Sequence, residues 1–116
     1  MNEPIRKWDI CLADLNPAFK SEPGKIRPVV IVQTNLLNQT HPSTIVCPIS
    51  SQVRLGVEIL RINIKPHKNT GLEKPSAILV DQIRAIDNKR LLKKLGALTE
   101  KDRLRLHESL KIIILE

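Results

Sequence analysis

The sequence predicts a mainly β domain of the α+β type, in which a small curled sheet or barrel is closed by one C-terminal helix. Short β-rich segments bounded by Pro, Gly and Asn recur over residues 8–98. One segment with helical periodicity follows them. The 116 residues match the length of one ordinary domain, and no linker or repeat divides them. We therefore expect a single domain, 1–116, with five to seven strands.

The first two strands enclose a polar loop. Residues 8–15 alternate between two faces until Asn16 and Pro17 end the strand. The second strand, 29–33, begins with four consecutive β-branched residues, which need burial on both faces. The charged residues that end the loop at 18–26 are therefore expected at the rim of a rigid element.

Three more strands are expected in the middle of the chain. A short helical turn at 35–39 precedes the third strand at 44–50, in which Pro48 implies a sheet edge or a bulge. Residues 57–64 alternate as a fourth strand. After a long polar loop, strand character returns at 76–86.

The C-terminal part combines a short strand with the helix. Residues 94–98 are expected to form the strand. Thr99, with Asp102 three residues later, is typical of an N-cap that opens a helix at 100–114. Its apolar face is expected to comprise Leu104, Leu106, Leu110, Ile113 and Ile114.

The charge balance favours a polyanionic partner. Lys and Arg number 19 against 12 Asp and Glu, a formal net charge of +7, and residues 84–111 hold nine basic and four acidic side chains. Nucleic acid or an acidic protein suits such an excess. Trp8 and Phe19 are the only aromatic residues of the Phe, Trp and Tyr class, which disfavours base stacking as the main mode of binding.

The cysteines and the apolar content indicate a reduced compartment. Cys11 and Cys47 each lie in an apolar segment and have no Cys or His at metal-ligand spacing, so we expect buried thiols and no metal. The N-terminal residues lack an export signal, and no apolar stretch approaches the roughly 20 residues that cross a bilayer. We expect a cytoplasmic protein with no membrane association.

Candidate chemical groups gather where strands begin and end. They are Glu22, Lys25 and Arg27 before the second strand, Ser50 and Ser51 after the third, and Gln82 and Arg84 after the fifth. Such groups at a rigid rim suit charge stabilisation and proton transfer at a phosphodiester. If the second and third strands are antiparallel, Arg27 and Ser50 face each other.

Each of these residues also has a structural interpretation. Glu22 serves as a solubilising loop residue, Ser50 as a turn hydroxyl, and Arg84 as the ion-pair partner of Asp81 or Asp87. A two-imidazole ribonuclease is disfavoured, because the three histidines lie in separate segments, at His41, His67 and His107.

Four motifs, in order along nearly the whole chain, resemble the MazF/PemK (Kid) toxin endoribonucleases. The first spans 14–31 and includes Asn16-Pro17, Ser21-Glu22 and Arg27-Pro28; the others span 48–51, 71–84 and 87–98. Trp8 stands where this family often has Gly, and Lys20 and Pro23 replace residues that are commonly Gly and Gln. These differences affect the conformation of the loop and the RNA sequence preference more than the chemistry.

The resemblance implies an SH3-like small barrel that forms a homodimer and cleaves single-stranded RNA, usually mRNA, at specific sequences without metal or cofactor. It also implies a cognate MazE-like antitoxin with an acidic tail that blocks the site. The catalytic residues would be Arg27 and Ser50, with Glu22 in support, and the RNA-binding residues would be Lys25, Ser51, Gln82, Arg84 and Phe19.

The implied reaction is attack of the ribose 2′-oxygen on the adjacent phosphorus, which leaves a 2′,3′-cyclic phosphate and a free 5′-hydroxyl. Arg27 would stabilise the charge on phosphorus, Ser50 would donate to a phosphate oxygen, and Glu22 is a competing candidate for the base. Two alternatives remain at this point: a non-catalytic relative on the same barrel, such as a CcdB-like gyrase poison, and a plain basic nucleic-acid-binding domain.

Overall fold

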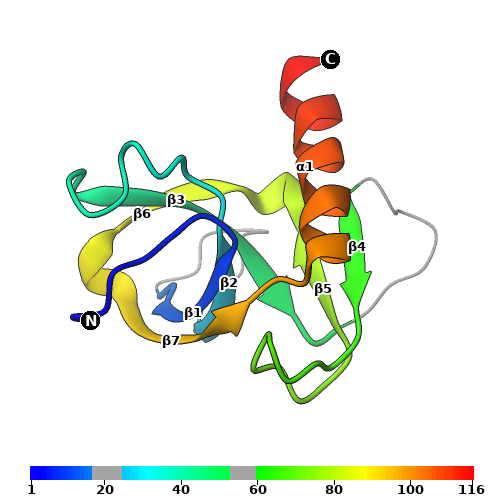
Figure 1. The fold of residues 1–116 in the computed structure, drawn as a ribbon, viewed down its shortest axis with the longest axis horizontal. Coiled ribbons are helices and arrows are strands. Elements are labelled where there is room, and N and C mark those ends of the chain that lie inside the picture. Colours follow the sequence, from blue (N-terminus) through cyan, green and yellow to red (C-terminus); the bar gives the residue numbers. More distant parts are fainter. Residues whose placement is uncertain (17–24, 53–59) are drawn as a thin grey trace.

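The computed structural model describes residues 1–16, 25–52 and 60–116, which form a curved seven-stranded sheet and one α-helix (Figure 1). The strands are β1 (Asp9–Asp14), β2 (Ile26–Ile31), β3 (Ser43–Ser50), β4 (Arg61–Ile64), β5 (Ser76–Leu79), β6 (Arg84–Asp87) and β7 (Leu91–Ala97). Their order is β4-β5-β3-β2-β1-β7, with β6 also paired to β3, and all these pairs are antiparallel. The predicted class and number of strands are confirmed, although the sheet is open, with β4 and β7 at its ends.

The central strands are buried on both faces. Successive side chains of a strand point to opposite sides, and the two sides belong to two apolar clusters: Val30 packs in one, Val29 and Ile31 in the other. All three side chains are fully buried, as the β-branched run predicted, whereas Val32, the fourth residue of the run, follows the end of β2 and is partly buried. The strand begins at Ile26, earlier than the predicted 29–33, and Arg27 lies within it. The residues at the start of β2 therefore extend from a strand that is fixed on both faces.

The third strand, β3, changes partner along its length. On one side it pairs with β2, and on the other its residues 43–46 pair with β6 while Ile49 and Ser50 pair with β5. Pro48 lies between the two stretches, so its missing N–H coincides with the change of partner. The predicted sheet edge at Pro48 is wrong, because β3 is a central strand.

The expected single strand at 76–86 is divided in two. β5 and β6 are separated by the 3₁₀ turn η1 (Val80–Gln82), whose Val80 is fully buried. The turn moves the chain from one end of β3 to the other, which no local pattern in the sequence signals. A second 3₁₀ turn, η2 (Asn88–Arg90), leads into β7, which is longer than the strand predicted at 94–98.

Of the strand predicted at 57–64, residues 57–59 lie outside the described residues, and the described part forms β4 from Arg61. The short helical turn predicted at 35–39 is confirmed: residues 35–40 form hydrogen-bonded turns, in which the N–H of His41 donates to the carbonyl of Leu37 (2.9 Å), four residues earlier as in an α-helix.

The helix α1 (Glu100–Leu115) begins as predicted. The hydroxyl oxygen of Thr99 accepts a hydrogen bond from the N–H of Asp102 (3.3 Å), which confirms the N-cap. Leu106 is fully buried, whereas Leu104 is 63% exposed and Ile114 56% exposed, so their assignment to the buried face is wrong. For Ile114 the reason is visible in Figure 1, where the C-terminal end of α1 projects away from the sheet. Leu104 lies two residues before the buried Leu106, and therefore on the opposite face of the helix.

The described part of the chain contains no helix whose length and apolar character would allow it to span a membrane.

The chain enters β1 through a strained residue. Trp8 has φ +78°, a region that glycine adopts easily and a large side chain does not, which fits the glycine common here in the resembling family. Backbone hydrogen bonds hold it there: its N–H donates to Ile31 (2.7 Å) and its carbonyl accepts from Leu98 (2.9 Å). The Lys7 Nζ lies 4.7 Å from the centre of the Trp8 ring system.

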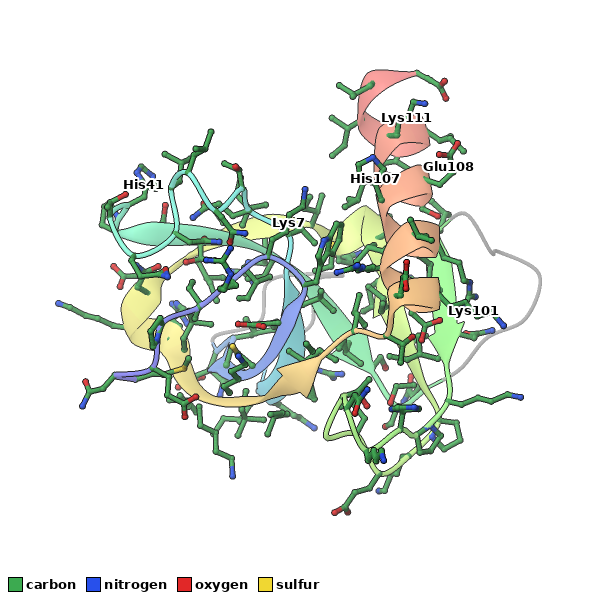
Figure 2. All side chains as sticks on the ribbon, viewed as in Figure 1. Lys7, His41, Lys101, His107, Glu108 and Lys111 are labelled. Carbon is green, nitrogen blue, oxygen red and sulfur yellow. The ribbon has the colours of Figure 1, made fainter. Side chains whose placement is uncertain are left out.

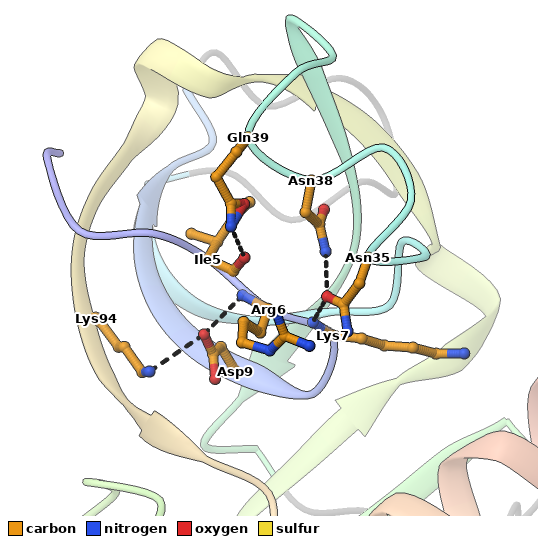
Figure 3. A network of polar contacts seen from close by, with 8 residues as sticks. All are labelled: Ile5, Arg6, Lys7, Asp9, Asn35, Asn38, Gln39 and Lys94. Atoms are coloured by element: carbon orange, nitrogen blue, oxygen red, sulfur yellow. Dashed lines mark hydrogen bonds and ion pairs between the residues drawn. The ribbon is translucent and has the colours of Figure 1, made fainter.

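The N-terminal segment is tied to the sheet by the polar contacts in Figure 3. The buried carboxylate of Asp9 accepts a hydrogen bond from the N–H of Arg6 (2.8 Å) and forms an ion pair with Lys94 of β7 (3.3 Å). The amide of Gln39 donates to the carbonyl of Ile5 (2.8 Å). These contacts fix the entry to β1.

Candidate nucleic-acid interface

A hollow of about 380 Å³ lies where β2 begins and β3 ends. Its walls come from residues 25–28, from Ile49 and Ser51, from residues 71–76 without Pro75, and from Leu95 of β7. Three cationic side chains line it, Lys25, Arg27 and Lys74. We call this hollow the cationic recess; its chemistry suits an anionic ligand such as a phosphodiester.

The sheet register brings two predicted catalytic residues together. Val29 of β2 lies opposite Pro48 of β3. Extending this antiparallel register by two residues sets Arg27 opposite Ser50, with both side chains on the same face of the sheet. The expected antiparallel arrangement of these strands is confirmed.

The two serines at the end of β3 differ in exposure. Ser50 is only 8% exposed, and its hydroxyl oxygen accepts a hydrogen bond from the N–H of Gln52 (3.1 Å). This bond uses a lone pair and not the hydroxyl proton, so Ser50 keeps a donor. Ser51 is exposed and lines the cationic recess directly.

Both stems of the β1–β2 loop are held by hydrogen bonds. The N–H of Lys25 donates to the Asn16 side-chain oxygen (2.6 Å), and the N–H of Leu15 donates to the Lys25 carbonyl (2.9 Å). The Arg90 guanidinium donates to the carbonyls of Asp14 (3.0 Å) and Asn16. Asn16 and Arg90 therefore fix the stem two residues from Arg27.

The role of Asn16 and Arg90 in holding this stem is not among the roles that the sequence predicts. The Asn-Pro pair that ends β1 was the only local signal for Asn16, and nothing local indicates that Arg90 reaches back to the same strand.

Gln82 and Arg84 lie away from the cationic recess. Gln82 is in η1, and Arg84 begins β6 opposite Val46, four residues before Ser50 on β3. At roughly 3.3 Å per residue, this places Arg84 about 13 Å along the sheet from Ser50. The structure therefore does not gather all the predicted contact residues into one hollow.

Two predicted site residues, Glu22 and Phe19, lie outside the described residues.

Asp81 and Asp87, the two carboxylates predicted as possible partners of Arg84, contact other residues. Asp81 forms an ion pair with Arg61 of β4, and Asp87 accepts the N–H of Lys89 (2.8 Å).

The histidines lie on separate elements, as the sequence indicated. Figure 2 places His41 and His107 on different parts of the molecule, the first in the loop before β3 and the second on α1. Within residues 1–16, 25–52 and 60–116, no group of three or more His, Cys, Asp or Glu side chains is arranged to hold a metal ion.

Both thiols are buried and protonated at neutral pH. Burial, followed by the charge of Asp9, raises the pKa of Cys11 from 9.0 to about 12. Burial, followed by the charge of Asp81, does the same for Cys47. A thiol with so high a pKa is a poor nucleophile, so neither cysteine is a candidate for catalysis.

The fold and the recess together define a class of protein: a small basic β domain with cationic side chains at a fixed strand rim, suited to a polyanion. Comparison with known protein families identifies the family within this class. Residues 6–114 match the model of the PemK-like, MazF-like toxins of type II toxin-antitoxin systems. The chain is 39% identical over 108 residues to the Endoribonuclease MazF of Staphylococcus epidermidis, covering 93% of this chain and 89% of that protein. The chain therefore belongs to the PemK-like, MazF-like toxin family.

Solved structures agree with this assignment at the level of the fold. MazF (Form-I) from Deinococcus radiodurans superposes with a TM-score of 0.82 at 16% identity, over 97% of this chain and 98% of that one. An endoribonuclease in complex with its cognate antitoxin from a mycobacterial species gives a TM-score of 0.76 at 16% identity, over 97% of each chain.

Proposed function

We propose that this protein is a single toxin domain, 1–116, that cleaves single-stranded RNA, chiefly mRNA, at specific sequences in the cytoplasm. Family membership supports a toxin, and the relative at 39% identity is named an endoribonuclease. The observation that carries the proposal is the cationic recess, in which Arg27 extends from a doubly buried strand opposite the end of β3. The proposed reaction uses neither metal nor cofactor, and its nucleophile is the ribose 2′-oxygen of the substrate.

The proposed reaction is a transesterification. The ribose 2′-oxygen loses its proton and bonds to the adjacent phosphorus, while the bond from phosphorus to the 5′-oxygen breaks and that oxygen gains a proton. Arg27 stabilises the negative charge that develops on the non-bridging oxygens, and Ser50 donates its hydroxyl proton to one of them. Glu22 is the proposed base.

Substrate contacts extend beyond the recess. Lys25 and Ser51 line it, whereas Gln82 and Arg84 lie further along β3, so an extended strand of RNA that follows β3 would meet both groups. Phe19 completes the proposed contacts. The protein acts as a homodimer, and a MazE-like antitoxin with an acidic tail competes with RNA for the cationic recess.

The test is incubation of the purified protein with a long single-stranded RNA in EDTA, followed by mapping of the ends. We expect discrete cuts with 2′,3′-cyclic phosphate and 5′-hydroxyl ends. Arg27→Ala should abolish cleavage. Arg103→Ala, which removes the same charge from an exposed position on α1, should not.

Two outcomes would contradict the proposal, and a third would move its test to Ser50. RNA that is bound but intact would indicate a plain nucleic-acid-binding domain. Absence of RNA binding together with stalled gyrase would indicate the gyrase poison. An Arg27→Ala protein that is unfolded by circular dichroism would make Arg27 structural, and Ser50→Ala, expected to lower the rate about 100- to 1000-fold, then decides whether this site cleaves RNA.

A further inference from the structure

A second hollow adjoins the cationic recess. It measures about 390 Å³ and is lined by Pro66, His67 and Lys68 together with residues 71–73. Residues 71–73 also line the cationic recess, so the two hollows share one wall. That wall is the loop that joins β4 to β5, residues 65–75, which we call the β4–β5 loop.

The β4–β5 loop is held in place by its own hydrogen bonds. The Thr70 hydroxyl donates to the His67 carbonyl (2.8 Å) and accepts the N–H of Leu72 (3.2 Å). Thr70 is fully buried, and Leu72 belongs to the apolar cluster that contains Leu106. The loop is therefore formed before any ligand binds, which lowers the entropic cost of binding.

The same loop is docked on β7. The N–H of Ala97 donates to the Asn69 carbonyl (2.8 Å). Gly71 has φ +73°, and a Cβ there would lie 2.4 Å from the carbonyl oxygen of Leu95. This close approach fixes the backbone next to Glu73.

Several exposed side chains of the loop are charged or can donate a hydrogen bond. Lys65, His67 and Lys68 are exposed before the buried Thr70, and Glu73 and Lys74 are exposed after the buried Leu72. Because the His67 Nδ1 accepts the N–H of Asn69 (3.0 Å), the neutral ring carries its proton on Nε2. The loop thus offers a ring N–H donor, three cations and one carboxylate.

Glu73 is the unusual member of this group. Among the described residues that line the two hollows it is the only acid, and it faces a surface otherwise rich in cations. A carboxylate repels a phosphodiester, so it does not help to bind the RNA backbone. A carboxylate does accept hydrogen bonds from the N–H groups of a base.

Bases differ in what they offer a carboxylate. Cytosine and adenine present an exocyclic amino group, and guanine presents an amino group beside a ring N–H. Uracil offers one ring N–H between two carbonyl oxygens, and these oxygens repel the carboxylate. Single-stranded RNA exposes these edges to a protein.

We propose that the second hollow is a nucleotide subsite in which Glu73 accepts a hydrogen bond from the amino group of a base, so that Glu73 is a specificity-determining residue. This inference rests on the proposed RNA-cleaving function. The base lies next to the nucleotide that is cut, because the two hollows share residues 71–73. Lys68 neutralises the phosphate of this neighbouring nucleotide.

The experiment compares wild type with Glu73→Gln, in which the amide both accepts and donates hydrogen bonds. Ends mapped on a long RNA should show an amino-bearing base at one fixed position beside the cut in the wild type. Glu73→Gln should raise cleavage at sites with uracil in that position about tenfold relative to the others, which corresponds to about 1.4 kcal/mol.

The matched control is Glu108→Gln, which makes the same chemical change at an exposed position on α1 (Figure 2). Both variants raise the net charge by one and should strengthen binding to every RNA, Glu73→Gln by the larger factor because Glu73 lines the recess. Only Glu73→Gln should change the cleavage at sites with uracil relative to the cleavage at the other sites.

A second readout does not depend on cleavage. Fluorescence polarisation with ten-nucleotide oligo-cytidine and oligo-uridine should show a wild-type preference for oligo-cytidine that Glu73→Gln removes and Glu108→Gln retains. A wild-type protein that cuts no RNA yet shows this pattern would reject the proposed function and keep the subsite. The subsite would be overturned if wild type and Glu73→Gln cut at the same sites and showed the same affinity for oligo-cytidine relative to oligo-uridine. This conclusion would hold whichever RNA the wild type cleaves.

Discussion

Gly96 of β7 is the residue at which a single added methyl group should do the most to displace the β4–β5 loop. A Cβ at this position would lie 2.2 Å from the carbonyl oxygen of Asn69 and 2.8 Å from that of Thr70. Contacts with backbone oxygen this short cannot be relieved by rotating a side chain. In Gly96→Ala, therefore, the loop must retreat by about 1 Å.

The cost of this retreat follows from the contacts that it strains. Overpacking of this kind costs about 1–3 kcal/mol. The hydrogen bond from the N–H of Ala97 to the carbonyl of Asn69 also lengthens from 2.8 Å, at a cost of about 1 kcal/mol. We expect Gly96→Ala to lose about 2–4 kcal/mol of unfolding free energy, and the Tm to fall by about 8–16 °C, at about 4 °C per kcal/mol for a domain of this size.

The assay combines thermal unfolding by circular dichroism with RNA-cleavage kinetics. Because the β4–β5 loop forms a wall of both hollows, KM should rise in Gly96→Ala. Ile86→Ala is the control: it removes a buried side chain of the other apolar cluster, at a cost of about 2–5 kcal/mol, and should leave KM unchanged below its Tm. A Gly96→Ala protein that melts within 2 °C of wild type would refute the reasoning, since the loop would then not depend on this contact.

The remaining predictions concern the helix and the thiols. Thr99→Ala removes the hydroxyl that accepts the N–H of Asp102, and should lower the free energy of unfolding in urea by about 0.5–1 kcal/mol. This is the low end for an N-cap, because the hydrogen bond is 3.3 Å long. Leu106→Ala leaves a cavity beneath α1 and should cost about 2–5 kcal/mol in the same assay. Since burial raises the pKa of Cys11 and Cys47 to about 12, iodoacetamide at pH 8 should label them only after unfolding. The contribution of the two thiols to stability should be constant below pH 9 and be lost towards pH 12 in urea titrations, because the unfolded thiols release protons that the folded ones retain.

Local patterns predicted most of the elements. The β-branched run of 29–32 needs burial on both faces, and Val29 to Ile31 are indeed fully buried between the two clusters. Thr99 and Asp102 mark the start of α1 because the cap depends on residues only three positions apart. Such features involve near neighbours in the sequence, so they are visible before the chain folds.

The errors have a common physical origin in contacts between distant residues. Pro48 lies in a central strand because β5 and β6 share β3, and the break between them accommodates the missing N–H. Ile114 has the helical spacing of the apolar face that contains Leu110, but the sheet extends beneath only part of α1. Periodicity gives the face of a helix and not the extent of the surface that covers it.

The sequence by itself determined the fold class and the family resemblance, since these depend on residue types and their order. Only the tertiary structure decided which groups meet. The antiparallel register of β2 and β3, continued two residues past the pair of Val29 and Pro48, sets Arg27 opposite Ser50, and the register of β6 places Arg84 about 13 Å further along β3. The docking of the β4–β5 loop on β7 brings Glu73 to the recess. These juxtapositions depend on strand register and close packing between residues far apart in the chain, and sequence spacing does not encode them.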